Sequence, residues 1–153
     1  MIHALTDILD PACVTLDIRG RKKPEIIREL VDLLAQAGRV DDTDDTVSRI
    51  LERESLTTTG IGGGIAIPHC MSPQISEMAV AFGRHPSGVK FDAVDRQPVQ
   101  LFFLVVAPSG SHTEHLQVLS KISRYLHDPN FKNALLSAAA PEEVVQLFAE
   151  RER

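Results

Sequence analysis

The spacing of apolar residues changes several times along this chain, and each change predicts a different element of secondary structure. Residues 13–18 alternate well enough to form a strand. Between residues 26 and 34 the apolar side chains recur on one face of a helix. Pro24 suits the first turn of that helix, and Gly38 suits its C-terminal end.

The middle of the chain adds a second helix and a group of strands. The helix is predicted to begin near Asp42 or Thr43. Turn-forming residues at 85–88 would join two of the strands as a hairpin. The strands are expected at 65–67, 78–84, 89–91 and 99–107. The last of these is the most apolar segment of the chain, which is typical of a strand buried on both faces.

The C-terminal third is predicted to be helical. Ser111 and Glu114 fit a capping box, in which two side chains bind exposed backbone N–H groups at a helix start. Later helices are expected at 131–137 and 141–150. Because helices and strands interleave around a doubly buried strand, we predict an α/β fold, a three-layer helix/sheet/helix sandwich. The capped helix is expected to turn inward the residues Leu116, Leu119, Ile122 and Leu126.

Length and charge narrow the class of protein. At 153 residues the chain is most simply one domain, spanning residues 1–153. Its 43% hydrophobic and 24% charged residues are ordinary for a soluble globular protein. The formal net charge of −5 argues against a general nucleic-acid binder. One basic stretch, residues 19–23, is either a solvated loop before a helix or an anion-binding patch.

Two further features favour a cytoplasmic location. Residues 1–10 show no secretory signal, and the longest apolar run, residues 101–107, is much too short to span a bilayer. We therefore expect no direct membrane insertion. Cys13 and Cys70 form no disulfide framework, which fits free thiols in a reducing cytoplasm.

Residues 60–64 hold four glycines, but they fit neither common nucleotide-binding loop. A Walker A loop needs a lysine after its last glycine, and there is no lysine between Glu54 and Val89. A dinucleotide fingerprint spaces its glycines as G-x-G-x-x-G and follows a strand, whereas these glycines have another spacing and precede one. Nucleotide binding is therefore not expected, and we predict no cofactor.

The same segment suits an anion site. Threonine hydroxyls and glycine N–H groups can form a concave nest, in which we predict phosphate contacts from Thr58, Thr59, Gly60 and Gly62. Pro68 cannot extend a strand ladder, so His69 is expected where the strand ends. A neutral imidazole there has a free lone pair and suits a phosphate-accepting nucleophile. The alternative is a turn whose glycines merely allow tight packing.

Two residues elsewhere in the chain would complete such a site. His115 lies one turn into the helix that Ser111 begins, where the backbone favours negative charge. It can therefore donate a hydrogen bond to a phosphoryl oxygen. Arg53 can clamp a phosphate through its guanidinium group. Alternatively, His115 is only a partly exposed helix residue, and Arg53 only forms an ion pair on the helix surface.

Two other chemistries compete for these residues. His69, Cys70, His112 and His115 are all zinc-ligand types, but neighbouring residues of an extended chain point apart, and we predict no metal site. Cys70 beside a histidine also suggests a thiol nucleophile. No oxyanion-stabilising or third-residue pattern supports that chemistry.

The residues around His69 also resemble a known family. Arg53-Glu54, followed by the glycines and by Pro68-His69, resembles the signature of fructose/mannitol-type enzyme IIA domains of the bacterial phosphoenolpyruvate-dependent phosphotransferase system. Residues 91–99 and 114–116 resemble that family too, so the resemblance covers nearly the whole chain. Cys70 departs from a glycine that is common in the family, which would narrow the approach to His69 or make it sensitive to oxidation. Gly63 departs from a position that is often polar, which would loosen the turn.

The resemblance implies a fold and a function. It implies a mixed sheet covered by helices on both faces, and phosphate transfer to His69 from a phosphohistidine on the carrier HPr or its nitrogen-branch counterpart. His115 and Arg53 match the family positions that support the active histidine. The absence of fused channel or IIB sequence favours the freestanding nitrogen-regulatory branch. The alternative is a IIA subunit that passes phosphate to the IIB component of a fructose or mannitol permease.

Overall fold

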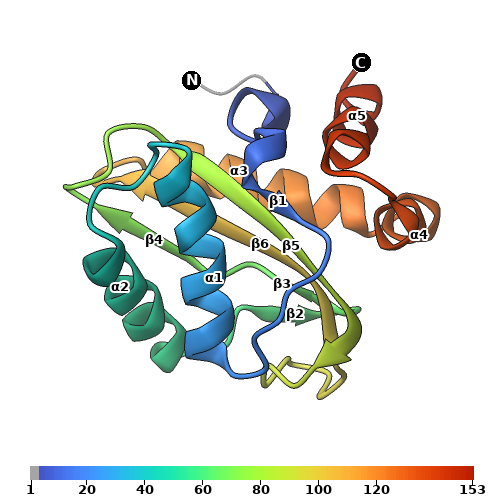
Figure 1. Ribbon diagram of the computed structural model, residues 1–153, viewed down its shortest axis with the longest axis horizontal. Helices are drawn as coiled ribbons and strands as arrows, with labels where there is room; N and C mark the ends of the chain where they lie inside the picture. The colour runs from blue at the N-terminus through green and yellow to red at the C-terminus, as the bar shows by residue number, and fades with distance from the viewer. Residues whose placement is uncertain (1–3) are drawn as a thin grey trace.

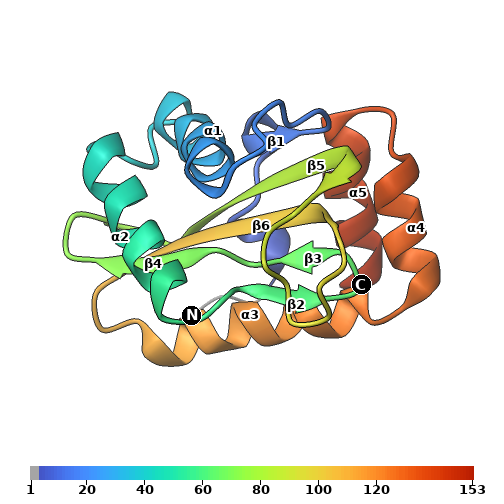
Figure 2. The same ribbon diagram turned by 90° about the horizontal axis from the view of Figure 1, so that it is seen from below.

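The computed structural model describes residues 4–153 as a β-sheet between two layers of helices (Figures 1 and 2). Helices α1 (Lys23–Gln36) and α2 (Thr43–Leu56) cover one face of the sheet. Helices α3 (His112–Leu126), α4 (Pro129–Ser137) and α5 (Pro141–Arg151) pack against the other face. The arrangement confirms the predicted three-layer α/β sandwich.

The sheet is built around β6 (Val99–Pro108). The long strand β5 (Ala79–Val89) pairs antiparallel with one side of β6, and β1 (Val14–Thr15) pairs parallel with β5. On the other side of β6, β3 (Ile65–Ala66) and β4 (His69–Ser72) pair parallel with successive parts of the strand. Strand β2 (Gly60–Gly62) pairs antiparallel with β3. Because both directions occur, the sheet is mixed.

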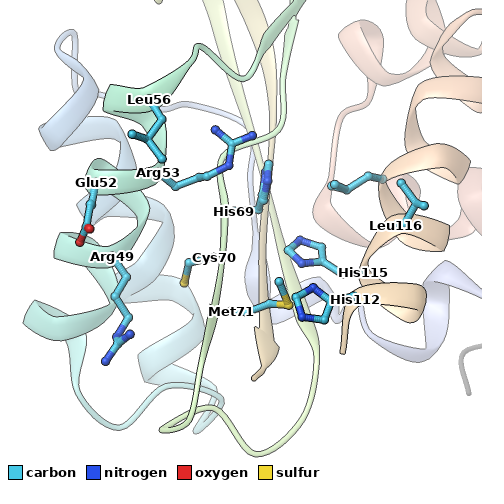
Figure 3. Close-up of a pocket in the computed structure, with 11 residues that line it drawn as sticks. Arg49, Glu52, Arg53, Leu56, His69, Cys70, Met71, His112, His115 and Leu116 are labelled. Atoms are coloured by element: carbon cyan, nitrogen blue, oxygen red, sulfur yellow. The ribbon is translucent and has the colours of Figure 1, made fainter. Parts of the chain in front are cut away.

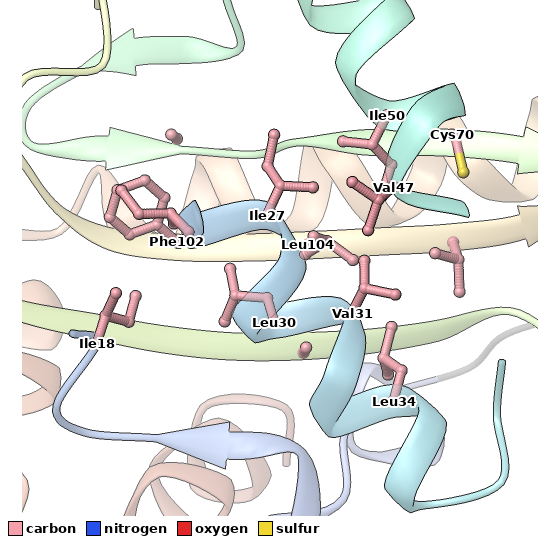
Figure 4. Close-up of a cluster of buried hydrophobic side chains, with 14 of the residues drawn as sticks. Ile18, Ile27, Leu30, Val31, Leu34, Val47, Ile50, Cys70, Phe102 and Leu104 are labelled. Carbon is pink, nitrogen blue, oxygen red and sulfur yellow. The ribbon is translucent and has the colours of Figure 1, made fainter. Parts of the chain in front are cut away.

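Strand β6 supplies side chains to two separate apolar clusters. Phe102 faces α1, where it packs with residues such as Ile27 and Leu30 (Figure 4). The next residue, Phe103, faces the opposite helices and meets Phe148 of α5 edge-on, with ring centroids 5.9 Å apart. Successive residues of a strand point to opposite faces, so the doubly buried strand predicted from its composition anchors both layers.

The predicted boundaries of α1 are confirmed. Pro24 lies in the first turn, and Gly38 follows the helix with a φ of +76°. The N–H of Gly38 donates to the carbonyl of Ala35, and the N–H of Arg39 donates to that of Leu34. This pair of bonds is a Schellman motif, which needs a left-handed residue at the position that Gly38 occupies.

The turn predicted at residues 85–88 is wrong. Strand β5 continues through these residues to Val89, and the chain reverses in the loop of residues 90–98 instead. Between Arg84 and Val89 the register with β6 shifts, so a bulge takes up the extra residues. Gly88 has a φ of +77° in this bulge, which explains why turn-forming residues occur inside a strand.

The strand predicted at residues 13–18 is much shorter than expected. Strand β1 contains only Val14–Thr15 and follows a short 3₁₀ helix, Pro11–Cys13; another 3₁₀ helix spans Leu5–Asp7. The chain leaves the ladder after β1, and Ile18 packs over Gly83 of β5. A Cβ built on Gly83 would lie 2.5 Å from Cδ1 of Ile18, so only glycine leaves room for this contact.

Helix α3 begins at the predicted place, but its capping box is not formed. Ser111 is the N-cap residue, yet its side chain makes no capping hydrogen bond. Its φ of −84° and ψ of 38° are not the extended conformation that a capping side chain needs. The predicted buried face is also partly wrong, because Leu116 is 65% exposed. The buried residues of α3 are His115, Val118, Ile122, Tyr125 and Leu126.

Candidate functional site

The prediction that His69 lies where a strand ends is wrong, because His69 is the first residue of strand β4. Strands β3 and β4 follow one another along the same side of β6, with Pro68 between them. Pro68 has no N–H to donate, but its carbonyl accepts a hydrogen bond from Val105 of β6 at 2.9 Å. This bond keeps the chain aligned with β6, so pairing resumes at His69.

The His69 ring is held by the backbone just before it. Its Nδ1 lies 2.7 Å from the carbonyl oxygen of Ile67. A carbonyl oxygen can only accept a hydrogen bond, so Nδ1 carries the proton and Nε2 keeps the lone pair of the neutral ring. Burial lowers the pKa of His69, and the charge of Arg53 lowers it further, against opposing effects of the Ile67 carbonyl and Glu54. The neutral, nucleophilic form therefore dominates at neutral pH.

His69 lies in a pocket between α2 and α3 with a volume of about 420 Å³. Arg53 reaches into this pocket from α2, and His115 approaches His69 from α3 on the opposite side (Figure 3). Arg53, His69 and His115, which were predicted from separate motifs, thus lie in one pocket. Other lining residues include Arg49, Glu52, Leu56, His112 and Leu116.

His115 is buried with an unused hydrogen-bonding atom. Its side chain is 4% exposed, and its ring meets that of His69 edge-on, with centroids 4.9 Å apart. Among the buried side-chain nitrogen and oxygen atoms of residues 4–153, Nε2 of His115 is the one without a hydrogen-bond partner. Burial and the neighbouring His69, His112 and Arg53 lower the pKa of His115 to about 4. A neutral imidazole in this position can donate a hydrogen bond to an anion beside His69.

Arg53 lies in the last turn of α2, with its side chain directed across the pocket (Figure 3). Its Nη1 donates a long hydrogen bond of 3.4 Å to the carbonyl of Thr57. A guanidinium has five N–H donors in a planar fork. The bond to Thr57 therefore leaves donors for two oxygens of one anion.

The two threonines predicted to contact phosphate make hydrogen bonds to other residues. Thr59 is buried, and its N–H and hydroxyl both donate to the carboxylate of Glu54. The hydroxyl of Thr58 donates to the carbonyl of Phe91 and accepts from the N–H of Gly60. Neither threonine is among the residues that line the His69 pocket. The geometry gives their predicted role no support.

The conformations and contacts of the glycines fit the packing alternative. Gly60 crosses the loop of residues 90–98 so closely that a Cβ would lie 2.8 Å from Cα of Ala93. Gly62, Gly63 and Gly64 have φ values of +95°, +66° and +81°, and they close the hairpin between β2 and β3. Gly60 and Gly62 do not line the pocket either. A close crossing and a tight turn account for the glycine run.

The competing thiol and metal chemistries lack the required geometry. Cys70 follows His69 in β4, and its side chain is 5% exposed (Figure 3). It packs in the apolar cluster beneath α1 and α2, here called the α1/α2 cluster, which includes Val31, Val47 and Ile50 (Figure 4). Burial raises the pKa of this thiol to about 11, so it stays protonated at neutral pH. Within residues 4–153, no three His, Cys, Asp or Glu side chains are arranged to hold a metal ion.

Two exposed leucines at the pocket were missed by the sequence analysis. Leu56 of α2 is 78% exposed and Leu116 of α3 is 65% exposed, and both line the pocket. Leu116 was expected to face the core. Leu56 lies off the buried face of α2, which was a signal available in the sequence, whereas the helical spacing of Leu116 wrongly placed it on the apolar face of α3.

Comparison with known proteins gives one consistent family. A model of that family, described as "Phosphoenolpyruvate-dependent sugar phosphotransferase system, EIIA 2", matches residues 7–151. The fructose-specific EIIA component of the phosphotransferase system from Haloferax volcanii is 38% identical over 150 residues, which cover 94% of this chain and 97% of that protein. Within the described part of the chain, no helix is long and apolar enough to cross a membrane.

Solved structures agree with the sequence comparison. The crystal structure of the nitrogen regulatory protein IIA-Ntr from Neisseria meningitidis has a TM-score of 0.88 and 30% identity, and the match covers 94% of this chain and 98% of that one. The mannitol IIA of Escherichia coli, solved in complex with phosphorylated mannitol IIB, has a TM-score of 0.80 and 26% identity, covering 94% of this chain and 100% of that one. The chain therefore belongs to the EIIA type 2 family of the phosphoenolpyruvate-dependent sugar phosphotransferase system.

Proposed function

We propose that His69 accepts a phosphoryl group from a phosphohistidine on HPr or its nitrogen-branch counterpart. The observation that carries this proposal is the hydrogen bond from Nδ1 of His69 to the Ile67 carbonyl. It assigns the lone pair to Nε2 in a neutral ring, which is the nucleophilic form of histidine. The proposed product is a phosphohistidine intermediate with phosphorus on Nε2.

The proposed transfer needs no separate acid or base, because each ring already carries its proton on the nitrogen that does not bind phosphorus. Nε2 of His69 attacks the phosphorus of the donor, and a new N–P bond forms as the donor's N–P bond breaks. The leaving ring takes the bonding electron pair and departs as a neutral imidazole, with the proton already on its other nitrogen. The His69 ring keeps its Nδ1 proton and gains positive character, which the Ile67 carbonyl stabilises at 2.7 Å.

Two groups in the pocket would stabilise the moving phosphoryl group. The unpartnered Nε2 of His115 can donate a hydrogen bond to one of its oxygens. The Arg53 guanidinium can hold two more oxygens from the α2 side. The first turn of α3, where His112 and His115 lie, adds the favourable field of a helix N-terminus. These groups are positively polarised or charged, which suits the negative charge spread over the transferring group.

The surroundings of the pocket suit a protein donor. Leu56 and Leu116 expose apolar side chains at the mouth of the pocket, where a small phosphate ester would leave them in water. A protein that carries a phosphohistidine can cover both leucines while its phosphoryl group reaches His69. Exposed apolar residues next to a reactive group are typical of a protein-docking surface.

Two fates of the phosphate are each favoured by a separate observation. The similarity to IIA-Ntr of Neisseria meningitidis favours a regulator whose phosphorylation state selects its partners. The similarity to the fructose-specific component of Haloferax volcanii favours onward transfer to a sugar-specific IIB. We propose the regulatory role first and keep IIB transfer as the second candidate.

The test is reconstitution with labelled phosphoenolpyruvate, enzyme I and each phosphocarrier in turn, followed by addition of fructose and mannitol IIB components. We expect a label on His69 that is lost in acid and survives mild base. Label that stays on the protein with every IIB supports regulation, whereas transfer to a IIB supports the second candidate. Label mapped to a serine, a threonine or Cys70 would overturn the proposal.

A further inference from the structure

Glu54 is a buried carboxylate next to the pocket but outside its lining. Its side chain is 3% exposed. Oε2 accepts a hydrogen bond from the N–H of Thr59 at 2.9 Å and from Nζ of Lys23 at 3.1 Å, and Oε1 accepts from the Thr59 hydroxyl at 2.5 Å. Two donors from one residue and one ammonium group thus hold the carboxylate in a fixed orientation.

A continuous series of hydrogen bonds leads from Glu54 to the His69 ring. Glu54 accepts from the N–H of Thr59, and the carbonyl of Thr59 accepts from the N–H of Ile67 at 3.0 Å. The carbonyl of Ile67 in turn lies 2.7 Å from Nδ1 of His69. The bond that fixes the tautomer of His69 is therefore made by a residue whose own position depends on Thr59 and Glu54.

Simple packing does not explain a charge at this position. Burying a carboxylate costs free energy that only good hydrogen bonds offset, and an apolar side chain of similar size would fill the same space without that cost. The hydrogen bonds of Glu54 instead fix the segment that connects α2 to β2. Hydrogen bonds to an ionised group are short and directional, which suits fixing a backbone position.

We propose that Glu54 is a positioning residue for phosphate acceptance, because it holds Thr59 and Ile67 so that His69 keeps Nδ1 protonated and Nε2 aimed into the pocket. Glu54 does not touch the reacting atoms. This role rests on the proposed function of His69. Arg53 is the neighbouring residue in the last turn of α2, so the same contacts also fix the helix end that presents the guanidinium.

The variant that tests the role is Glu54→Gln, which keeps the size of the side chain. A glutamine has one acceptor oxygen in place of two, so it cannot accept from Thr59 and Lys23 as the carboxylate does. The matched control is Glu152→Gln, because Glu152 does not line the pocket. Glu152 accepts from the backbone N–H of Leu5, from the hydroxyl of Tyr125 and from Nζ of Lys121, which is the same set of donor types.

Two measurements report on His69 in these proteins. The ¹⁵N shifts of its ring nitrogens show which nitrogen carries the proton, without any phosphate present. The rate of labelled phosphate uptake from the phosphocarrier, divided by the folded fraction, shows the effect on transfer. In Glu54→Gln we expect a mixed tautomer and a kcat roughly ten- to hundredfold lower, with KM for the carrier nearly unchanged. Glu152→Gln should keep the wild-type shifts and rate.

The outcomes decide whether Glu54 positions His69 or only stabilises the fold. Wild-type ring shifts and uptake in folded Glu54→Gln would overturn the positioning role, and so would equal losses in Glu152→Gln. If Glu54→Gln does not fold, Thr59→Val replaces it, since that change removes one donor to Glu54 and leaves the backbone N–H. If the wild-type protein takes up no phosphate while Glu54→Gln still changes the His69 tautomer, the proposed function fails, and what stands is only that Glu54 sets the protonation of the His69 ring.

Discussion

The rings of His69 and His115 meet edge-on, with centroids 4.9 Å apart and planes at 89°. One ring comes from the start of β4 and the other from the first turns of α3. The two imidazoles differ in what holds them. His69 has its Nδ1 bound to the Ile67 carbonyl, whereas Nε2 of His115 is buried without a partner. An anion attached to His69 would supply the partner that His115 lacks.

The first prediction separates the two histidines by their roles. His69→Ala should take up no phosphate, because the variant has no nucleophile. His115→Ala should still be labelled on His69, but about two to three orders of magnitude more slowly, which is the usual cost of losing one transition-state donor. Labelling kinetics and the site of the label check both expectations. Label on His115 with His69 dispensable would reverse the assignment, and wild-type rates in His115→Ala would separate the two residues functionally.

The second prediction concerns Arg53. Its hydrogen bond to the Thr57 carbonyl is long, so Arg53 contributes little to the folded state. Arg53→Lys should keep the thermal midpoint within a few degrees while slowing phosphate uptake, because an ammonium group cannot bind two phosphate oxygens as a guanidinium does. Uptake and thermal unfolding are measured on the same preparation. A variant that unfolds while its folded fraction takes up phosphate normally would assign Arg53 a structural role.

The third prediction is a pH dependence of stability. The pKa of His115 falls from an ordinary 6.5 to about 4 in the folded protein. Between these values the unfolded chain binds more protons than the folded one, so stability falls as the pH drops from 6.5 towards 4. The lowered pKa of His69 acts in the same direction. Urea unfolding should show a lower free energy of unfolding at pH 5 than at pH 7, and His115→Gln should remove about 2 kcal/mol of that loss. An equal loss in both proteins would contradict it.

The fourth prediction is that Cys70 neither blocks His69 nor reacts. Burial raises the pKa of its thiol to about 11, and its side chain packs in the α1/α2 cluster. In a Cys13→Ala background, iodoacetamide at neutral pH should label Cys70 slowly when the protein is folded and rapidly in guanidinium. Cys70→Ala should leave phosphate uptake unchanged and cost roughly 1 kcal/mol of stability. Fast labelling of the folded protein would restore the oxidation-sensitive role.

Sequence patterns predicted the layers well because those depend on long apolar periodicities. The apolar spacing in α1 and the unbroken apolar run in β6 each had one simple structural solution. The bulge near Gly88 and the hairpin glycines were harder, since their conformations depend on the strands that pair beside them. The proximity of Arg53, His69 and His115 is tertiary: their chemistry suggested one phosphate site and the family resemblance supported it, but no local pattern could place them together. Glu54 belonged to the family signature, but the sequence did not indicate its role, because that role depends on donors from Thr59 and Lys23.

The last prediction tests docking through the two exposed leucines. Leu116 is 65% exposed at the pocket, so Leu116→Asp should leave the fold intact. A carboxylate there would have to be desolvated beneath the carrier, which should raise KM for the phosphocarrier about tenfold or more while kcat changes little. Leu56→Asp should act in the same way. Val94 is a matched control, because it is 70% exposed but does not line the pocket. Val94→Asp should therefore keep the wild-type KM. An equal rise in KM for Val94→Asp would mean that added negative charge repels the carrier from anywhere on the surface, and the apolar docking site would then be wrong.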